Sequence, residues 1–203
     1  IARDGYTCVQ LMAVAEHPYY ASFGYHVSNF FAPADNFGTP EDLKRLVDAA
    51  HGLGLRVIMD LIHSHCVKNE LEGLGNFAGR RTQFFHEGER GVHPAWNSYC
   101  FDYSKPQVAR FLLSNCRFWI EEYHIDGFRF DGVTSMLYFD HGLGRAFTSY
   151  DDYFGPNVDW DSVAYLTMAN ELCHELERQV TTIAEDVSGM PGLAMPEKDG
   201  GIG

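Results

Sequence analysis

The sequence predicts an α/β fold, a partial (β/α)8 TIM barrel that comprises about half of a catalytic barrel, roughly its strands two to five. Short apolar segments of strand type alternate with segments of helical periodicity along the chain. Acidic or histidine side chains follow the apolar segments, as at the mouth of a barrel, where several strands end together. The glycine-rich turn that a nucleotide-binding doubly wound sheet would use does not follow an early strand.

The clearest helix–strand unit runs over residues 39–62. Thr39 is the expected N-cap and Pro40 the first helical residue, and apolar side chains then recur at helical spacing. Gly54 lies past the predicted helix end. The apolar segment 55–62 is typical of a strand buried on both faces of a parallel sheet, and its acid is Asp60.

Three further predicted strands are also followed by acidic or histidine side chains. One follows a helix that begins near Ser104, and another follows a helix that we expect Asp161 to cap. The remaining strand lies upstream of the first predicted helix. These strands and the polar residues that follow them are 8–14 with Glu16 and His17, 128–130 with Asp131, and 180–184 with Glu185. The segments 63–102 and 135–160 are predicted to be long loops that carry substrate contacts. We expect residues 1–203 to be the central part of one catalytic domain, without a second domain.

Composition limits the class of partner. The formal net charge of −13 argues against nucleic acid and against an anionic membrane surface, so a neutral substrate fits better. The five cysteines are odd in number and scattered, which suits free thiols in a reducing compartment and makes a cysteine zinc site unexpected. No stretch approaches 18 consecutive apolar residues. We expect a soluble, cytoplasmic protein.

The segment Gly-Phe-Arg-Phe-Asp-Gly places Arg129 and Asp131 two residues apart on a strand, so their side chains share one face. The guanidinium beside the carboxylate should lower the pKa of Asp131 and keep it ionised, as a nucleophile requires. An ordinary structural ion pair at a strand end is an equally good interpretation of this spacing.

Glu185 follows the last predicted strand and is the candidate acid. We expect apolar walls around its carboxyl to raise its pKa, so that it holds a proton near neutral pH. Asp186 should point the other way. Two carboxylates in opposite environments are what glycoside chemistry uses, because one attacks the anomeric carbon while the other protonates the leaving oxygen.

His63 and His65 form a His-x-His pair after a strand, and such a pair can bind zinc in barrel hydrolases. The remaining strand ends offer no histidine in register, so we favour a packed or solvated loop histidine for His63. A metal-dependent barrel hydrolase that uses His63 and His65 stays open as an alternative. The aromatic residues after the first strand are Tyr19, Tyr20, Phe23, Tyr25, Phe30 and Phe31. Stacking on sugar rings is plausible for them, but we expect core packing for most.

Three segments, in order, resemble the first three signature regions of the α-amylase clan of glycoside hydrolases. They are Asp-Leu-Ile-His-Ser-His, Gly-Phe-Arg-Phe-Asp-Gly-Val and Ile-Ala-Glu-Asp-Val-Ser-Gly. The sequence around them, such as Glu-His-Pro-Tyr-Tyr-Ala-Ser-Phe-Gly-Tyr, is similar to that of the eukaryotic-type 1,4-α-glucan branching enzymes of glycogen and starch biosynthesis. The resemblance covers nearly the whole chain.

The resemblance implies roles for particular residues. Asp131 would form a β-glycosyl intermediate and Glu185 would protonate the leaving group and later deprotonate the acceptor. Arg129 would position Asp131. The residues implied to line the subsite of the cleaved glucose are Tyr25, Asp60 and His65. The fourth clan signature, a His-Asp pair, has no counterpart before Gly203.

The resemblance also implies a substrate class and no cofactor. The expected partner is an α-1,4-glucan, glycogen or starch, acted on by a monomeric enzyme in the cytoplasm, or in a plastid if the organism makes starch. Many amylases bind calcium through an asparagine where this chain has Ser64, so a calcium site is not expected. Water in place of a glucan acceptor would give an amylase-like hydrolase, and the carboxylates alone do not decide between the two reactions.

Overall fold

The computed structural model describes all residues from Ile1 to Gly203 and contains a four-stranded parallel sheet. The strands lie in the order β1, β4, β8 and β9, which is also their order along the chain. Their bounds are Cys8–Leu11 for β1, Arg56–Leu61 for β4, Gly127–Phe130 for β8 and Thr181–Ala184 for β9. Because each new strand is added to the same side of the sheet, the chain winds in one direction, as in a barrel. The predicted parallel sheet is confirmed.

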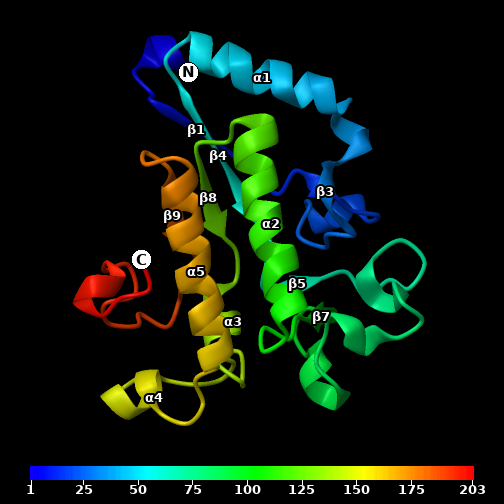
Figure 1. Cartoon of the computed structure of the whole chain (residues 1–203), viewed down its shortest axis with the longest axis vertical. Helices are drawn as coiled ribbons and strands as arrows, with labels where there is room; N and C mark the ends of the chain where they lie inside the picture. Colours follow the sequence, from blue (N-terminus) through cyan, green and yellow to red (C-terminus); the bar gives the residue numbers. More distant parts are fainter.

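Three long helices connect these strands. They are α1 (Pro40–Gly52), α2 (Pro106–Tyr123) and α5 (Trp160–Leu176). Figure 1 shows α2 and α5 side by side across the same face of the sheet. A doubly wound sheet would carry helices on both faces, whereas a barrel carries them only outside. The arrangement is therefore that of part of a (β/α)8 barrel.

The helix ends follow from local sequence. Thr39 and Asp42 form a reciprocal capping box at the start of α1, as the N-cap assignment predicts. The prediction for α5 is wrong by two residues, because Asp159 is the N-cap and accepts hydrogen bonds from the amides of Asp161 and Ser162. Asp159 also pairs with Arg90 at 2.6 Å, which ties the start of α5 to a distant loop.

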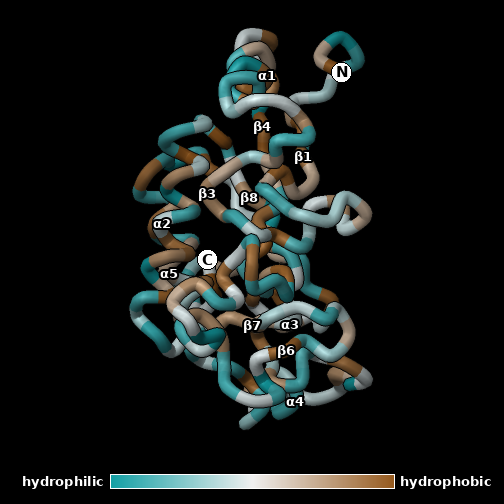
Figure 2. The backbone as a smooth tube through the Cα atoms, turned by 90° about the vertical axis from the view of Figure 1, so that its right-hand side faces the viewer, coloured by the Kyte–Doolittle hydropathy of each residue, from teal (hydrophilic) through white to brown (hydrophobic).

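The core lies between the sheet and the helices. The buried face of α2 repeats at helical spacing and includes Val108, Leu112, Cys116 and Trp119. In β4, Val57, Met59 and Leu61 are buried in the same cluster, so alternate residues of the strand face the helices. Figure 2 shows hydrophobic and hydrophilic residues alternating along α2 and α5, as in helices with one buried face. None of the helices has the length and apolar character that crossing a membrane requires.

The segments predicted to be long loops carry short elements of their own. Residues 63–102 form a three-stranded antiparallel sheet in the order β5, β7, β6. Its bounds are His65–Cys66 for β5, Val92–His93 for β6 and Ser98–Cys100 for β7, and another hairpin pairs β2 (Ala15–Glu16) with β3 (Asn29–Pro33). The short helices α3 (Val133–Leu137) and α4 (Tyr150–Phe154) follow β8. The loop prediction for 63–102 was wrong in this respect, and the small sheet gives that segment a fixed shape.

Candidate active site

Asp60 is the most buried acid at the carboxyl end of the sheet, with 3% of its surface exposed. Its Oδ2 accepts hydrogen bonds from Nη1 of Arg129 at 2.6 Å and from the hydroxyl of Tyr25 at 2.7 Å. Its Oδ1 accepts from Nε2 of Gln10 at 2.6 Å. Donors from β1, the following loop and β8 thus converge on one carboxylate, as a buried charge requires.

Arg129 connects three strand ends. Besides Asp60, its Nη1 lies 3.3 Å from Oδ1 of Asp131, and its Nη2 lies 3.7 Å from Oε2 of Glu185. The two candidate catalytic carboxylates, 54 positions apart by their numbers, therefore contact the same guanidinium. The structure brings Asp60, Arg129, Asp131 and Glu185 together at the carboxyl end of β4, β8 and β9, where barrel enzymes place their chemistry.

The pKa of Asp131 moves in the opposite direction to the sequence prediction. Burial, followed by the negative charge of Glu185, raises the pKa of Asp131 to about 6, although Arg129 acts to lower it. The prediction failed because burial of Asp131 and the charge of Glu185 together outweigh the effect of Arg129 on the pKa, and Arg129 contacts Asp60 more closely than Asp131.

The prediction that apolar side chains surround the carboxyl of Glu185 is wrong. Its side chain is 37% exposed, and its Oε2 accepts a hydrogen bond of 2.7 Å from the backbone amide of Gly132. The backbone of Glu185 is fixed by Phe130, whose carbonyl accepts from its amide at 3.0 Å. Asp186 points away, as expected, and accepts from the hydroxyl of Thr134 at 2.6 Å.

His65 is held as a neutral ring beside these groups. Its Nε2 donates to the carbonyl of Tyr25 at 2.8 Å, so its Nδ1 accepts from the hydroxyl of Ser64 at 2.9 Å. Burial lowers the pKa of His65 to about 3. The ring therefore joins Tyr25 to the loop after β4 and stays uncharged at neutral pH.

His63 is a packed core residue, as favoured from the sequence. Its two ring nitrogens bond the hydroxyl of Tyr165 and, at 2.9 Å, Oδ1 of Asn115. Burial lowers the pKa of His63 to about 4. All ring nitrogens of His63 and His65 have protein partners, so neither histidine has a lone pair available for a metal. The pair therefore provides no free nitrogen ligand for the metal-dependent hydrolase considered as an alternative.

The aromatic residues after β1 divide into two groups. Phe30 is buried, and Tyr25 and Phe31 are partly buried against the same core, in keeping with the packing interpretation. Tyr19, Tyr20 and Phe23 are between 60% and 66% exposed, so core packing is wrong for these three within the chain. They occupy a turn that is closed by a hydrogen bond from the amide of Tyr25 to the carbonyl of residue 22. Exposed rings therefore border the group that holds Asp60.

Sequence reasoning missed Gln10, Gly132 and Trp96 at this site. The alternation of side chains along a strand could have indicated Gln10. A polar side chain in a short apolar strand needs a polar partner on the face to which it points. Gly132 contributes only its amide and a left-handed backbone, with φ of 67°. Trp96 comes from a turn of the small sheet, which the sequence did not predict.

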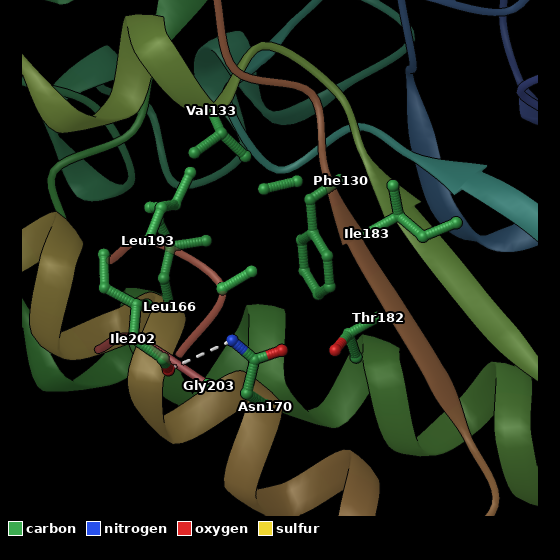
Figure 3. Close-up of a pocket in the computed structure, with 11 residues that line it drawn as sticks. Phe130, Val133, Leu166, Asn170, Thr182, Ile183, Leu193, Ile202 and Gly203 are labelled. Atoms are coloured by element: carbon green, nitrogen blue, oxygen red, sulfur yellow. Dashed lines mark hydrogen bonds between the residues drawn. The ribbon is translucent and has the colours of Figure 1, made fainter. Parts of the chain in front are cut away.

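An apolar pocket lies between β9, α5 and the last residues of the chain (Figure 3). Phe130 and Leu166 point into it, and Asn170 donates to the carbonyl of Ile202 at 3.2 Å across its rim. None of the candidate catalytic side chains lines it. Its lining of mainly hydrophobic side chains supports packing in this part of the chain and not acid–base chemistry.

Known proteins resemble this chain in family and in fold. The family described as "Alpha amylase, catalytic domain" matches residues 5–98. A solved α-amylase from Anoxybacillus superposes over 97% of this chain and 40% of its own, with a TM-score of 0.70 and 20% sequence identity. That likeness concerns the fold.

Curated relatives are much closer in sequence. The 1,4-alpha-glucan-branching enzyme of Aspergillus oryzae is 57% identical over 98% of this chain. The 1,4-alpha-glucan-branching enzyme 2-2, chloroplastic/amyloplastic, of Arabidopsis thaliana is 55% identical over the whole chain. The chain spans 29% and 25% of the length of these two relatives. With this sequence identity and an amylase-type fold, the chain belongs to the 1,4-α-glucan-branching enzymes of the α-amylase clan.

Proposed function

We propose that this chain is the central part of the (β/α)8 catalytic domain of an enzyme that forms α-1,6 branches in an α-1,4-glucan. The observation that carries the proposal is the contact of one guanidinium, that of Arg129, with both Asp131 and Glu185. Retaining glycosidases hold their two carboxylates about 5 to 5.5 Å apart. Contacts within 4 Å of a shared guanidinium are compatible with that separation.

In the first step Asp131 is the nucleophile. Its carboxylate attacks the anomeric carbon as the α-1,4 bond breaks, and a glucosyl ester forms on Asp131. Glu185 gives its proton to the departing O4, so that the leaving chain departs as a neutral alcohol. In the second step ionised Glu185 takes the proton from a C6 hydroxyl of another glucan chain, and that oxygen displaces Asp131. The two inversions together retain the α configuration.

The remaining groups bind the substrate. We propose that Tyr25, Asp60, His65 and Arg129 line the subsite of the glucose whose bond is broken. Tyr25 presents a ring for stacking while its hydroxyl is anchored on Asp60, and the neutral His65 offers no competing charge. The exposed rings at Tyr19, Tyr20 and Phe23 suit a polymer of neutral sugars.

The wider proposals follow from the relatives' names and from charge. The substrate is glycogen or starch, bound without a cofactor by a monomeric enzyme. Nucleic acid and membrane are not partners, since the net charge of −13 repels both. We place the enzyme in the cytoplasm, with a plastid as the alternative, because the Arabidopsis thaliana relative is named chloroplastic/amyloplastic.

The test uses the full-length enzyme and amylose. Asp131→Ala and Glu185→Gln should each abolish the change in iodine absorbance that branching produces, whereas Glu171→Gln, an exposed acid on α5, should not. Branching leaves the number of reducing ends unchanged, but hydrolysis increases it. Unchanged activity in either site variant would refute the assignments, and a rise in reducing ends that matches bond cleavage would favour the hydrolase.

A further inference from the structure

Trp96 lies against the residue that follows the candidate nucleophile. It is carried by the turn that joins β6 to β7, and it is half-buried. A Cβ atom placed on Gly132 would be 3.0 Å from Cη2 of Trp96 and 2.9 Å from Oγ of Ser64. The indole ring also lies 4.8 Å from the ring of His65, measured between centroids. A side chain of the small antiparallel sheet thus borders the catalytic end of the barrel strands.

The orientation of Trp96 is fixed by His93. The two rings are stacked, with centroids 3.8 Å apart and planes 6° apart, and the amide of Trp96 donates to Nδ1 of His93 at 3.2 Å. Burial, and then the neighbouring His141, lower the pKa of His93 to about 4. His93 is therefore uncharged at neutral pH and the stack is not opposed by a buried charge.

The contacts of His93 continue through His141 to α3, the short helix that follows Gly132. The ring of His141 lies 4.3 Å from that of His93, and Nδ1 of His141 bonds the hydroxyl and carbonyl of Ser135 at 3.1 Å. Ser135 belongs to α3, for which Gly132 is the N-cap. Gly132, α3, His141, His93 and Trp96 therefore form a closed ring of contacts, and the β8–α3 turn is held from both sides.

The turn held in this way contacts Glu185. The amide of Gly132 donates to Oε2 of Glu185 at 2.7 Å, and the amide of Val133 donates to the carbonyl of Glu185 at 3.0 Å. Gly132 adopts φ of 67°, so a small change in this turn would move its amide relative to the carboxylate. The Glu185 side chain is otherwise 37% exposed, and Nη2 of Arg129 lies 3.7 Å from its Oε2.

We propose that Trp96 is a positioning residue for Glu185, acting through Gly132. The inference rests on the proposed function, in which Glu185 protonates the leaving oxygen. Loss of the indole ring frees the β8–α3 turn to move toward the vacated space, and the amide of Gly132 then no longer fixes the carboxyl beside the bond to be broken. General acid catalysis contributes about 10²- to 10⁴-fold in rate, and small misplacements cost about 10²-fold.

The experiment compares two donors in the full-length enzyme. Amylose needs a proton on its leaving oxygen, whereas an α-maltooligosyl fluoride releases fluoride without one. Trp96→Ala should lower kcat on amylose by about 10²-fold and change the first-turnover release of fluoride by less than about threefold, since fluoride leaves without a proton from Glu185. Trp96→Phe, which keeps a ring on His93, should recover most of the loss. Trp160→Ala, at an exposed tryptophan on α5, is the control.

Glu185→Gln separates the two hypotheses. If it loses activity on amylose but keeps first-turnover fluoride release, while Trp96→Ala slows both donors equally, Glu185 is the acid and the role of Trp96 is refuted. If Glu185→Gln itself shows no difference between donors, the proposed function fails at its acid. A rise in KM for both donors without a change in kcat would also overturn the inference, because Trp96 would then only contact substrate. If Trp96→Ala does not fold, Trp96→Leu carries the same comparison, and Trp96→Phe remains the variant that keeps a ring on His93.

Discussion

Arg129 contacts Asp60, on the neighbouring strand, more closely than it contacts Asp131 on its own: the distances are 2.6 Å and 3.3 Å. The two partners of the pair lie opposite each other in the register of β4 and β8. The positive charge is thus directed mainly to an acid that is almost fully buried. Asp131 is left with burial and the charge of Glu185, which together raise its pKa to about 6.

The first prediction concerns pH. In the full-length enzyme, the rate of first-turnover fluoride release should fall below about pH 6 as Asp131 takes up a proton and ceases to be a nucleophile. Glu185→Gln removes the negative charge that raises the pKa of Asp131 most, so the midpoint of this fall should move to lower pH. Stopped-flow measurement of fluoride release between pH 4 and 8 would check both. A midpoint that stays in place would show that Glu185 is not a source of the shift.

The second prediction concerns stability. The pKa of Asp131 is about 6 in the folded state against an ordinary value of 3.8, so its protonated form is favoured by folding. The stability that the proton confers is complete below pH 3.8 and is lost as the pH rises through 6. Asp131→Asn should therefore raise the free energy of unfolding by about 1–3 kcal/mol at pH 7 and by much less at pH 4. Calorimetry of the full-length enzyme at both values would test this, and equal effects at the two pH values would contradict it.

The third prediction concerns Arg129. Arg129→Ala leaves the carboxylate of Asp60 buried with Tyr25 and Gln10 but no cation. The change should destabilise the enzyme by about 3 kcal/mol and abolish activity. Arg117→Ala, which removes an exposed pair with Glu121, should have little effect on stability, because water screens exposed ion pairs. Chemical denaturation of both variants gives the comparison, and similar losses would show that Arg129 is not the main partner of Asp60.

The fourth prediction concerns metals. All ring nitrogens of His63 and His65 have hydrogen-bond partners in the protein. Exhaustive dialysis against a chelator should leave activity unchanged, and metal analysis should find less than one equivalent bound. His63→Ala should lower the melting temperature, because Tyr165 and Asn115 lose a buried partner. Loss of activity on chelation, with recovery when zinc is returned, would restore the metal hypothesis.

The fifth prediction concerns the turn before Tyr25. A Cβ atom on Gly24 would be 2.0 Å from the carbonyl oxygen of Ala13, and its φ is 91°. Gly24→Ala should therefore displace Tyr25 from Asp60, raise KM for amylose and destabilise the enzyme by more than about 2 kcal/mol. Gly144→Ala has a similar φ of 66° with no atom within 4 Å, so it should cost only about 1 kcal/mol. Equal costs would mean that the contact with Ala13 relaxes.

The elements best predicted from sequence are those with strong local signals. The capping residue Thr39, Pro40 and the helical spacing after them predict α1, and the apolar segments predict all four strands of the sheet. The first strand was predicted too long, because β1 ends at Leu11 and Glu16 belongs to the β2–β3 hairpin. The three-stranded sheet within residues 63–102 was not predicted, because its strands of two or three residues are too short to show a period. Trp96 was missed with it.

The gathering of the site residues on one end of the sheet was predictable, but their electrostatics were not. Strand period places Arg129 and Asp131 on one face, yet it cannot show that Asp60 takes the shorter contact. The same holds for Glu185, whose partner is the backbone amide of Gly132 and not a side chain. Interactions between residues distant along the chain depend on the register of neighbouring strands, which no local pattern determines.

Because Asp60 pairs with Arg129 across β4 and β8, the site forms only when these two strands adopt their native register. A slip of one residue between these strands would turn one of the two side chains toward the helices, and Tyr25, Gln10 and Asp131 would lose their common centre. A compact chain with misaligned strands would therefore be inactive. Recovery of activity during refolding thus serves as a direct report that the strands have found their native alignment.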